Sequence, residues 1–365
     1  MIRRVFERLT AKIDGPLFAI VVCLLALGLA TLYSAAYQAP GRVGAQAVNV
    51  VLALALMWIA AQTPPQVFMR YAIPAFVVVL LMLAGVALFG DVRNGARRWL
   101  PLGFASLQPS EFMKIAMPLM LARYFHRHET SLRFREYAIA ALLLAVPTVM
   151  IVRQPDLGTA LLVAAAGFYV IFLAGLSWKI IAAGAALTIA SLYPLWYYAL
   201  HDYQRRRFLT LIDPSSDPLG AGYHIIQSTI AVGSGGITGK GWLGGTQTHL
   251  EFIPERATDF IFAVYSEEFG LIGASLLLVL YFSLIMRGLM IAANAPTFFT
   301  RLLAGSITLT FFTYAVVNMG MVSGLLPVVG VPLPLISYGG TSLVTLFVGI
   351  GILMSIQYHR TLVQS

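Results

Sequence analysis

Long apolar stretches, separated by short polar or Gly/Pro-containing connections, run along almost the whole chain. A membrane-spanning helix needs about 20 predominantly apolar residues, and ten stretches are candidates for that role. They cover about residues 16–36, 45–62, 71–89, 107–125, 136–152, 157–175, 179–200, 259–286, 300–323 and 339–357. The pattern therefore predicts an all-α polytopic membrane protein with ten transmembrane helices.

One large polar segment, residues 201–258, separates the seventh and eighth predicted spans. A loop of this length without the composition of a separate domain is usually functional. Its apolar run at 225–232 is too short to span a membrane and is predicted to form an interfacial or re-entrant helix. The chain shows no internal repeat or low-complexity tract, so we expect residues 1–365 to form a single integral-membrane domain.

Composition supports lipid as the natural solvent. Hydrophobic residues make up 59% of the chain and charged residues only 11%, whereas soluble domains carry about 25% charged residues. The net charge of +9 could indicate nucleic acid, but the cations lie between apolar runs and form no continuous basic face. We interpret them as topology charges that also attract anionic lipids and phosphate-bearing lipid substrates.

The placement of Lys and Arg in the short loops predicts the orientation. An even number of spans places both termini on one side, and the connections on that side hold most of the short-loop cations. Because cytoplasmic loops are enriched in Lys and Arg, both termini are predicted to be cytoplasmic. The 201–258 segment is then a periplasmic loop of a cell inner-membrane protein.

Glu111 and Lys114 stand three residues apart inside the fourth predicted span. Ionisable groups within a membrane are costly and tend to be paired and functional, and this spacing places both on one helix face. They can therefore form a buried ion pair that fixes packing, or line a polar cavity that binds a substrate head group. The spacing does not separate these two interpretations.

Four other carboxylates lie at or near predicted helix starts. Asp259 begins the eighth span, where spacing alone favours a helix cap, although the same position suits a general base acting on a sugar hydroxyl. Asp156, after Pro155, is predicted to start and cap the sixth span. Glu267 and Glu268 are predicted to be buried with packing or ion-pair partners.

A set of polar side chains is expected on the outer side. For any single member, ordinary loop solvation is sufficient, but as a group they could bind a pyrophosphate, which arginine contacts bidentately. The members retained as candidates are Arg97, Arg98, Arg153, Gln154, Arg206, Lys240 and Arg256.

Several familiar motifs are missing from the sequence. The glycine-rich stretch around Lys240 is not a nucleotide-binding P-loop, because Gly241 stands where Ser or Thr is required. The chain also lacks an acidic-x-acidic pair suited to a metal-bound sugar nucleotide. Residue patterns alone therefore predict a ten-span protein with a polar outer site, either an enzyme or a transporter.

Long ordered motifs, spread over essentially the whole chain, resemble the SEDS family (shape, elongation, division and sporulation) of peptidoglycan glycosyltransferases. The motif in the large loop of this chain resembles that of the family's elongation proteins more than that of its division proteins. The motifs are RRWLPLGFASLQPSEFMKIAMPLMLARYF (97–125), QPDLGTALL (154–162), the loop and following span (201–273), and GMVSGLLPVVGVPLPLISYGGTSL (320–343).

The resemblance implies polymerisation of lipid II into glycan strands at the outer face. It implies that the essential aspartate of the family is Asp259, and that its paired acidic and basic residues in the fourth span are Glu111 and Lys114. The family also implies a class B penicillin-binding protein of the elongation complex as partner. Ala257 is a departure, because the family commonly has histidine there, which weakens any chemical role for that histidine.

These expectations lead to a mechanistic hypothesis. Inversion from an α-linked pyrophosphate donor to a β-1,4 product suits a single displacement with Asp259 as general base. Outer arginines, with or without a divalent cation (Mg²⁺ or Mn²⁺), would stabilise the leaving pyrophosphate. The alternatives are a lipid II flippase and a scaffold for a cell-wall transpeptidase, since spans with intramembrane charges are also typical of transporters.

Overall fold

The structure is a computed structural model. It describes residues 12–361 except 38, 94–95, 102–105, 200–204, 206–208, 217–219, 251 and 254. Arg206, one of the predicted site residues, therefore lies outside the described residues.

A helix forms in each of the ten predicted ranges. The ten are α2 (Gly15–Ala35), α3 (Pro40–Gln62), α4 (Pro65–Phe89), α5 (Pro109–Arg127), α6 (Phe134–Arg153), α7 (Leu157–Leu173), α8 (Trp178–Pro194), α12 (Ile261–Ala293), α13 (Phe298–Val322) and α14 (Thr341–Thr361). By length and apolar composition, seven described helices can cross a membrane, namely α2, α3, α4, α6, α12, α13 and α14. The apolar helices α7 and α8 are shorter, with 17 residues each, so the count of ten spans stays a prediction.

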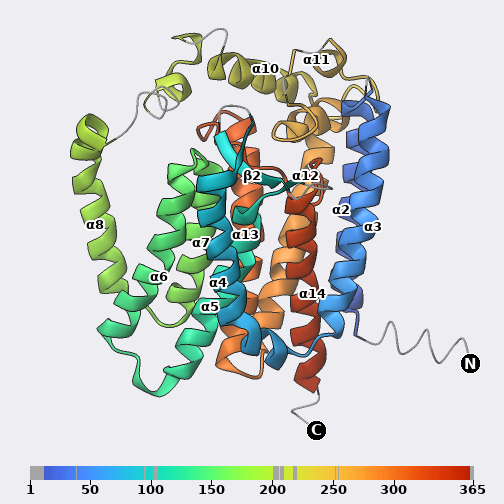
Figure 1. Ribbon diagram of the computed structural model, residues 1–365. Helices are drawn as coiled ribbons and strands as arrows, with labels where there is room; N and C mark the ends of the chain where they lie inside the picture. Colours follow the sequence, from blue (N-terminus) through green and yellow to red (C-terminus); the bar gives the residue numbers. More distant parts are fainter. Residues whose placement is uncertain are drawn as a thin grey trace, which may run out of the picture.

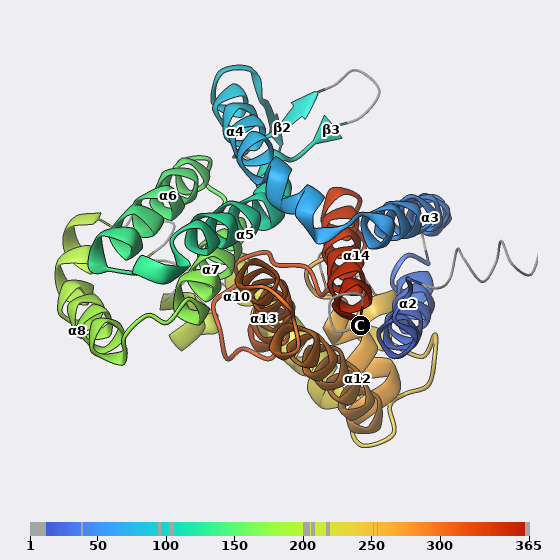
Figure 2. The same ribbon diagram turned by 90° about the horizontal axis from the view of Figure 1, so that it is seen from below.

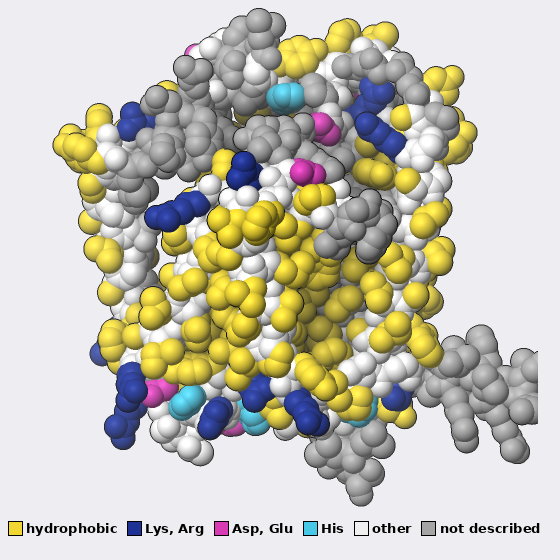
Figure 3. Space-filling model, in the orientation of Figure 1, with side chains coloured by type: hydrophobic (Ala, Val, Ile, Leu, Met, Phe, Trp, Pro, Cys, Tyr) yellow, Lys and Arg dark blue, Asp and Glu magenta, His cyan; other side chains and the backbone are white. Residues whose placement is uncertain are grey.

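The helices stand side by side in one bundle (Figure 1). Seen along the bundle, α5, α7, α13 and α14 lie near the middle, while α8 lies at the edge (Figure 2). A hydrophobic band crosses the face of the bundle seen in Figure 3, with Lys and Arg side chains above and below it. This distribution is typical of a membrane protein, because cations gather where the apolar band ends.

The 201–258 segment lies across one end of the bundle, here called the loop end (Figure 1). It contains the short helix η3 (Pro214–Ser216), α10 (Ala221–Ser234) and α11 (Thr246–His249). α10 includes the apolar run predicted to form an interfacial helix. Three short strands also lie toward this end, in the antiparallel order β1 (Asp91–Arg93), β2 (Ala96–Pro101) and β3 (Ser106–Leu107).

The loop is hydrogen-bonded into a break in α12. Gly270 has φ 61° and ψ −159°, which interrupts the helix. The freed carbonyl of Glu267 accepts the Lys240 N–H at 3.0 Å, and the Leu271 N–H donates to the Gly236 carbonyl at 2.9 Å. A Cβ on Gly239 would lie only 2.0 Å from the Glu268 carbonyl oxygen. The glycines of the loop therefore allow its backbone to pair with that of α12.

Close helix packing in the bundle depends on small residues, as is usual in membranes. A Cβ added to Gly351 of α14 would lie 2.3 Å from the Met57 carbonyl oxygen of α3. By contrast, a Cβ on Gly85 of α4 would meet no atom within 4 Å. The α3–α14 interface therefore has no room for a methyl group at position 351.

We expect Gly351→Ala to destabilise the bundle by about 1–3 kcal/mol, because the two helices must separate to admit the methyl group. Gly85→Ala serves as the matched control and should be neutral or slightly stabilising, since alanine favours the helix. Thermal unfolding of both variants in one detergent measures the difference. Equal melting temperatures would contradict the packing argument.

Candidate active site

A cavity of about 390 Å³ lies toward the loop end and is here called the Asp259 cavity. Its lining comes from five segments that are distant in sequence: β2, α5, the start of α7, the turn before α12 and the chain before α14. The charged residues among them are Arg98, Glu111, Lys114, Asp156, Glu255 and Asp259. The structure thus brings together four of the predicted site residues, and adds Asp156 and Glu255.

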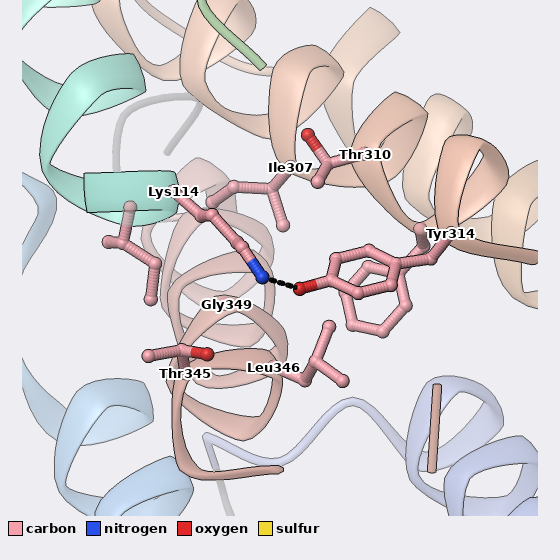
Figure 4. A pocket seen from close by; sticks show the side chains of 9 residues that line it. Lys114, Ile307, Thr310, Tyr314, Thr345, Leu346 and Gly349 are labelled. Atoms are coloured by element: carbon pink, nitrogen blue, oxygen red, sulfur yellow. Dashed lines mark hydrogen bonds between the residues drawn. The ribbon is translucent and has the colours of Figure 1, made fainter. Parts of the chain in front are cut away.

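Glu111 and Lys114 form the predicted ion pair on α5. Lys114 Nζ lies 2.7 Å from Glu111 Oε1, and both side chains are buried. Lys114 also donates to the Tyr314 hydroxyl of α13 (Figure 4), and Thr345 of α14 lies 3.5 Å from Glu111 Oε2. The pair joins three helices and lines the cavity, while binding of a substrate head group stays a prediction.

Hydrogen bonds to backbone carbonyls hold the turn that contains Asp259. Asn318 Nδ2 of α13 donates to the Asp259 carbonyl at 2.8 Å and to the Val331 carbonyl at 2.7 Å. The neighbouring Thr258 carbonyl accepts a hydrogen bond of 2.6 Å from Ser337 Oγ. These contacts hold the turn without using the Asp259 carboxylate.

The expectation that Asp259 caps α12 is wrong. The helix begins at Ile261, and Phe260 is its cap residue, without a side-chain hydrogen bond. The carboxylate instead lines the cavity, half-buried, and among the described residues it has no hydrogen-bond partner. The side chain is therefore available to a substrate.

The surroundings make Asp259 a better proton acceptor than an ordinary aspartate. Burial raises the pKa of its carboxyl to about 6. The nearby carboxylates of Glu255 and Asp156 also raise this pKa, while the Arg98 guanidinium lowers it. At neutral pH the group is still mostly ionised, and its pKa is close to that useful for a general base.

Asp156 differs because its hydrogen bonds are satisfied. Its Oδ1 accepts the Thr159 N–H at 3.2 Å, which confirms the predicted cap of α7, and its Oδ2 accepts from Gln108 Nε2 at 3.0 Å. Arg98 Nη1 lies 3.8 Å away, and Arg98 Nη2 donates to the Pro155 carbonyl at 2.6 Å. Asp156 therefore helps to hold Arg98 at the cavity wall.

The described members of the predicted outer polar set do not gather in one cluster, and phosphate binding by them stays a prediction. Arg97, Arg153 and Gln154 line a separate cavity of about 510 Å³, here called the Arg153 cavity. Gln154 Nε2 donates to the Leu83 carbonyl of α4 at 3.1 Å. Arg97 and Arg98 are neighbours in β2, and successive strand residues point to opposite faces.

Lys240 and Arg256 fasten the loop to the bundle. Lys240 Nζ lies 2.7 Å from Glu267 Oε1, which confirms an ion pair for this buried glutamate. Arg256 donates to the Ala35 carbonyl of α2 at 2.8 Å and to the Thr248 carbonyl at 3.1 Å. Neither side chain is among the described residues that line the Asp259 cavity.

Sequence reasoning missed Tyr314 and Asn318. Both lie on α13 and are buried, and they contact Lys114 and the Asp259 backbone respectively. Their spacing of four residues places them on one helix face. Two polar residues at that spacing within an apolar span could have indicated a buried polar face on this helix.

The described residues contain no group of three or more His, Cys, Asp or Glu side chains placed to hold a metal ion. Binding of Mg²⁺ or Mn²⁺ therefore stays a prediction.

The chain is similar to known proteins along nearly its whole length. The family model FtsW/RodA/SpoVE, described as cell cycle protein, matches residues 16–362. The peptidoglycan glycosyltransferase MrdB of Escherichia coli (strain K12) is 50% identical over 348 residues, which are 95% of this chain and 94% of the relative. Stage V sporulation protein E of Bacillus subtilis (strain 168) is 38% identical over 288 residues, 78% of this chain and 77% of the relative.

Solved structures share the fold. One, from work on the structural coordination of polymerization and crosslinking by a peptidoglycan synthase complex, has a TM-score of 0.84 at 36% identity, covering 95% of this chain and 98% of the other. The rod shape determining protein RodA of Thermus thermophilus has a TM-score of 0.72 at 30% identity, covering 95% and 97%. The prediction of an all-α multi-pass membrane protein is confirmed, and the chain belongs to the FtsW/RodA/SpoVE family, the SEDS family that its motifs resemble.

Proposed function

We propose that the chain is a peptidoglycan glycosyltransferase that polymerises lipid II into β-1,4-linked glycan strands during cell elongation and releases undecaprenyl pyrophosphate. The names of relatives at 50% identity support this activity. The observation that carries the proposal is the state of the Asp259 carboxylate. This group lines a polar cavity, its pKa is raised, and it has no hydrogen-bond partner among the described residues.

In the proposed reaction Asp259 accepts the proton of the acceptor's 4-hydroxyl as its oxygen attacks the donor anomeric carbon. The new C–O bond forms while the bond to the pyrophosphate oxygen breaks, and that oxygen leaves with the electron pair. Inversion at the carbon suits this single displacement. The buried Glu111–Lys114 pair keeps the inner wall of the cavity polar and rigid, which favours a fixed orientation of the two substrates.

The cavity wall supports an enzyme over a flippase. A flippase needs a polar path through the bundle toward the opposite end. Glu111 and Lys114 line the Asp259 cavity, and Lys114 also donates a hydrogen bond to Tyr314 of α13. A second pocket that Lys114 lines, together with Tyr314 and Thr345, is small, about 30 Å³, and it also includes the apolar Ile307 and Leu346 (Figure 4).

We place the protein in the bacterial inner membrane with both termini cytoplasmic and the loop end facing the periplasm, where lipid II is polymerised. A class B penicillin-binding protein is the proposed partner. The similar structure from a complex that coordinates polymerization and crosslinking supports such a pairing.

Asp259→Asn should lower the rate of lipid II polymerisation by 10²-fold or more, because an amide cannot accept the proton. The variant should retain its melting temperature, since the turn is held through backbone atoms. Asp213→Asn, the same chemical change at an exposed loop residue, is the matched control. A wild-type polymerisation rate in purified, partner-bound Asp259→Asn would remove the aspartate from the mechanism.

A base with a pKa of about 6 is ionised above that pH, so the rate should rise as pH increases through about 6 and then level off. Glu255→Gln removes a charge that raises this pKa and should move the midpoint lower. Arg98→Gln removes a charge that lowers it and should move the midpoint higher. Single-turnover rates across pH 4.5–8 (roughly the titration range) measure the midpoints, and shifts with the opposite signs would contradict the assignment.

A further inference from the structure

The Arg153 cavity lies between α4 and α6 at the loop end and is not explained by the proposed base chemistry. Its charged lining consists of Arg97 and Arg153, and its apolar lining includes Ala84, Ala87 and Met150. Arg97 Nη1 donates to the Ala87 carbonyl at 3.2 Å. Arg153 is exposed and has no hydrogen-bond or ion-pair partner among the described residues. The cavity therefore offers donors for an anion beside apolar walls.

The Arg153 cavity and the Asp259 cavity are adjacent, because consecutive residues line them. Arg98 belongs to the Asp259 cavity, whereas the preceding residue of β2, Arg97, belongs to the Arg153 cavity. In the same way Asp156 lines one cavity and Pro155 the other. Two pairs of consecutive residues thus divide between the cavities, which places them directly next to each other.

The charges of the two cavities are opposite. Two cations and four carboxylates line the Asp259 cavity, a formal excess of two negative charges. Two arginines and no described carboxylate line the Arg153 cavity. A diphosphate freed in the first cavity is repelled by its carboxylates, and the second cavity is the nearby place where guanidinium groups can bind it.

The apolar walls indicate what the anion is attached to. α4 and α6 contribute apolar side chains to the cavity lining, and one of them, Leu88, is 71% exposed. In a membrane protein these faces contact lipid. A ligand at this place can keep its head group on the arginines while a hydrocarbon chain extends between the helices into the bilayer.

We propose that the Arg153 cavity binds the polyprenyl diphosphate released by glycosyl transfer. Arg97 and Arg153 contact the diphosphate, and the walls formed by α4 and α6 contact the first isoprene units. The proposal rests on the proposed function, which supplies the diphosphate. A diphosphate monoester is favoured over the phosphodiester of an ordinary phospholipid, because it carries more negative charge for the two guanidinium groups.

The test measures binding and product inhibition with the full chain purified in detergent. The double variant Arg97→Gln/Arg153→Gln should bind undecaprenyl diphosphate at least tenfold more weakly by native mass spectrometry. The concentration of added undecaprenyl diphosphate that halves lipid II polymerisation should increase by a similar factor. Ala87→Phe, which fills the cavity without changing charge, should weaken binding of the same probe as well.

The matched control is Arg135→Gln/Arg301→Gln, which removes two exposed arginines at the opposite end and should bind undecaprenyl diphosphate like the wild type. Asp259→Asn should also bind it normally, so loss of the base and loss of this site are separable. Wild-type affinity in the Arg97/Arg153 double variant would overturn the proposal. Equal displacement of the probe by phosphatidylglycerol would also overturn it, and would assign the cavity to a phospholipid.

Discussion

The buried ion pair between Glu111 and Lys114 is the interaction on which the site depends. Two charges inside a membrane bundle are stable only when each has a close partner, and removing one partner of such a pair costs about 3–5 kcal/mol. Here the pair holds α5 against α13 and α14 through Tyr314 and Thr345. α13 in turn carries Asn318, which donates a hydrogen bond to the Asp259 carbonyl. The ion pair therefore holds together the helices that position the carboxylate.

Asp156 and Asp259 line the same cavity, but their carboxylates have different hydrogen-bond partners and therefore different roles. Asp156 caps α7, accepts a hydrogen bond from Gln108 and lies near Arg98, so its charge is already stabilised. Asp259 has a backbone that is held and a carboxylate without such donors among the described residues. Because no such donor among the described residues stabilises its charge, burial raises the pKa of Asp259. Two side chains of the same type therefore have different roles in one cavity.

Sequence patterns predict the parts of this molecule that depend on local spacing. Hydropathy locates the helices, the i,i+3 spacing identifies the Glu111–Lys114 pair, and Pro155 with Asp156 marks a helix start. The division of Arg97 and Arg98 between two cavities depends on β2, a short strand inside a stretch that reads as polar loop. Likewise the pairing of Lys240 with Glu267, across a break in α12, is a long-range contact without a local signal.

The broken helix explains why the part of the loop around Lys240, which does not line the Asp259 cavity, still supports the site. The first turns of α12 are held by the ion pair of Glu267 with Lys240 and by the backbone hydrogen bonds of the glycine-rich loop. Arg256 adds contacts to α2 and to the loop itself, three residues before Asp259. A helix start fixed on both sides cannot shift along its axis without breaking these contacts. The glycines are therefore required by the close approach of two backbones, and the position of the Asp259 turn follows from that approach.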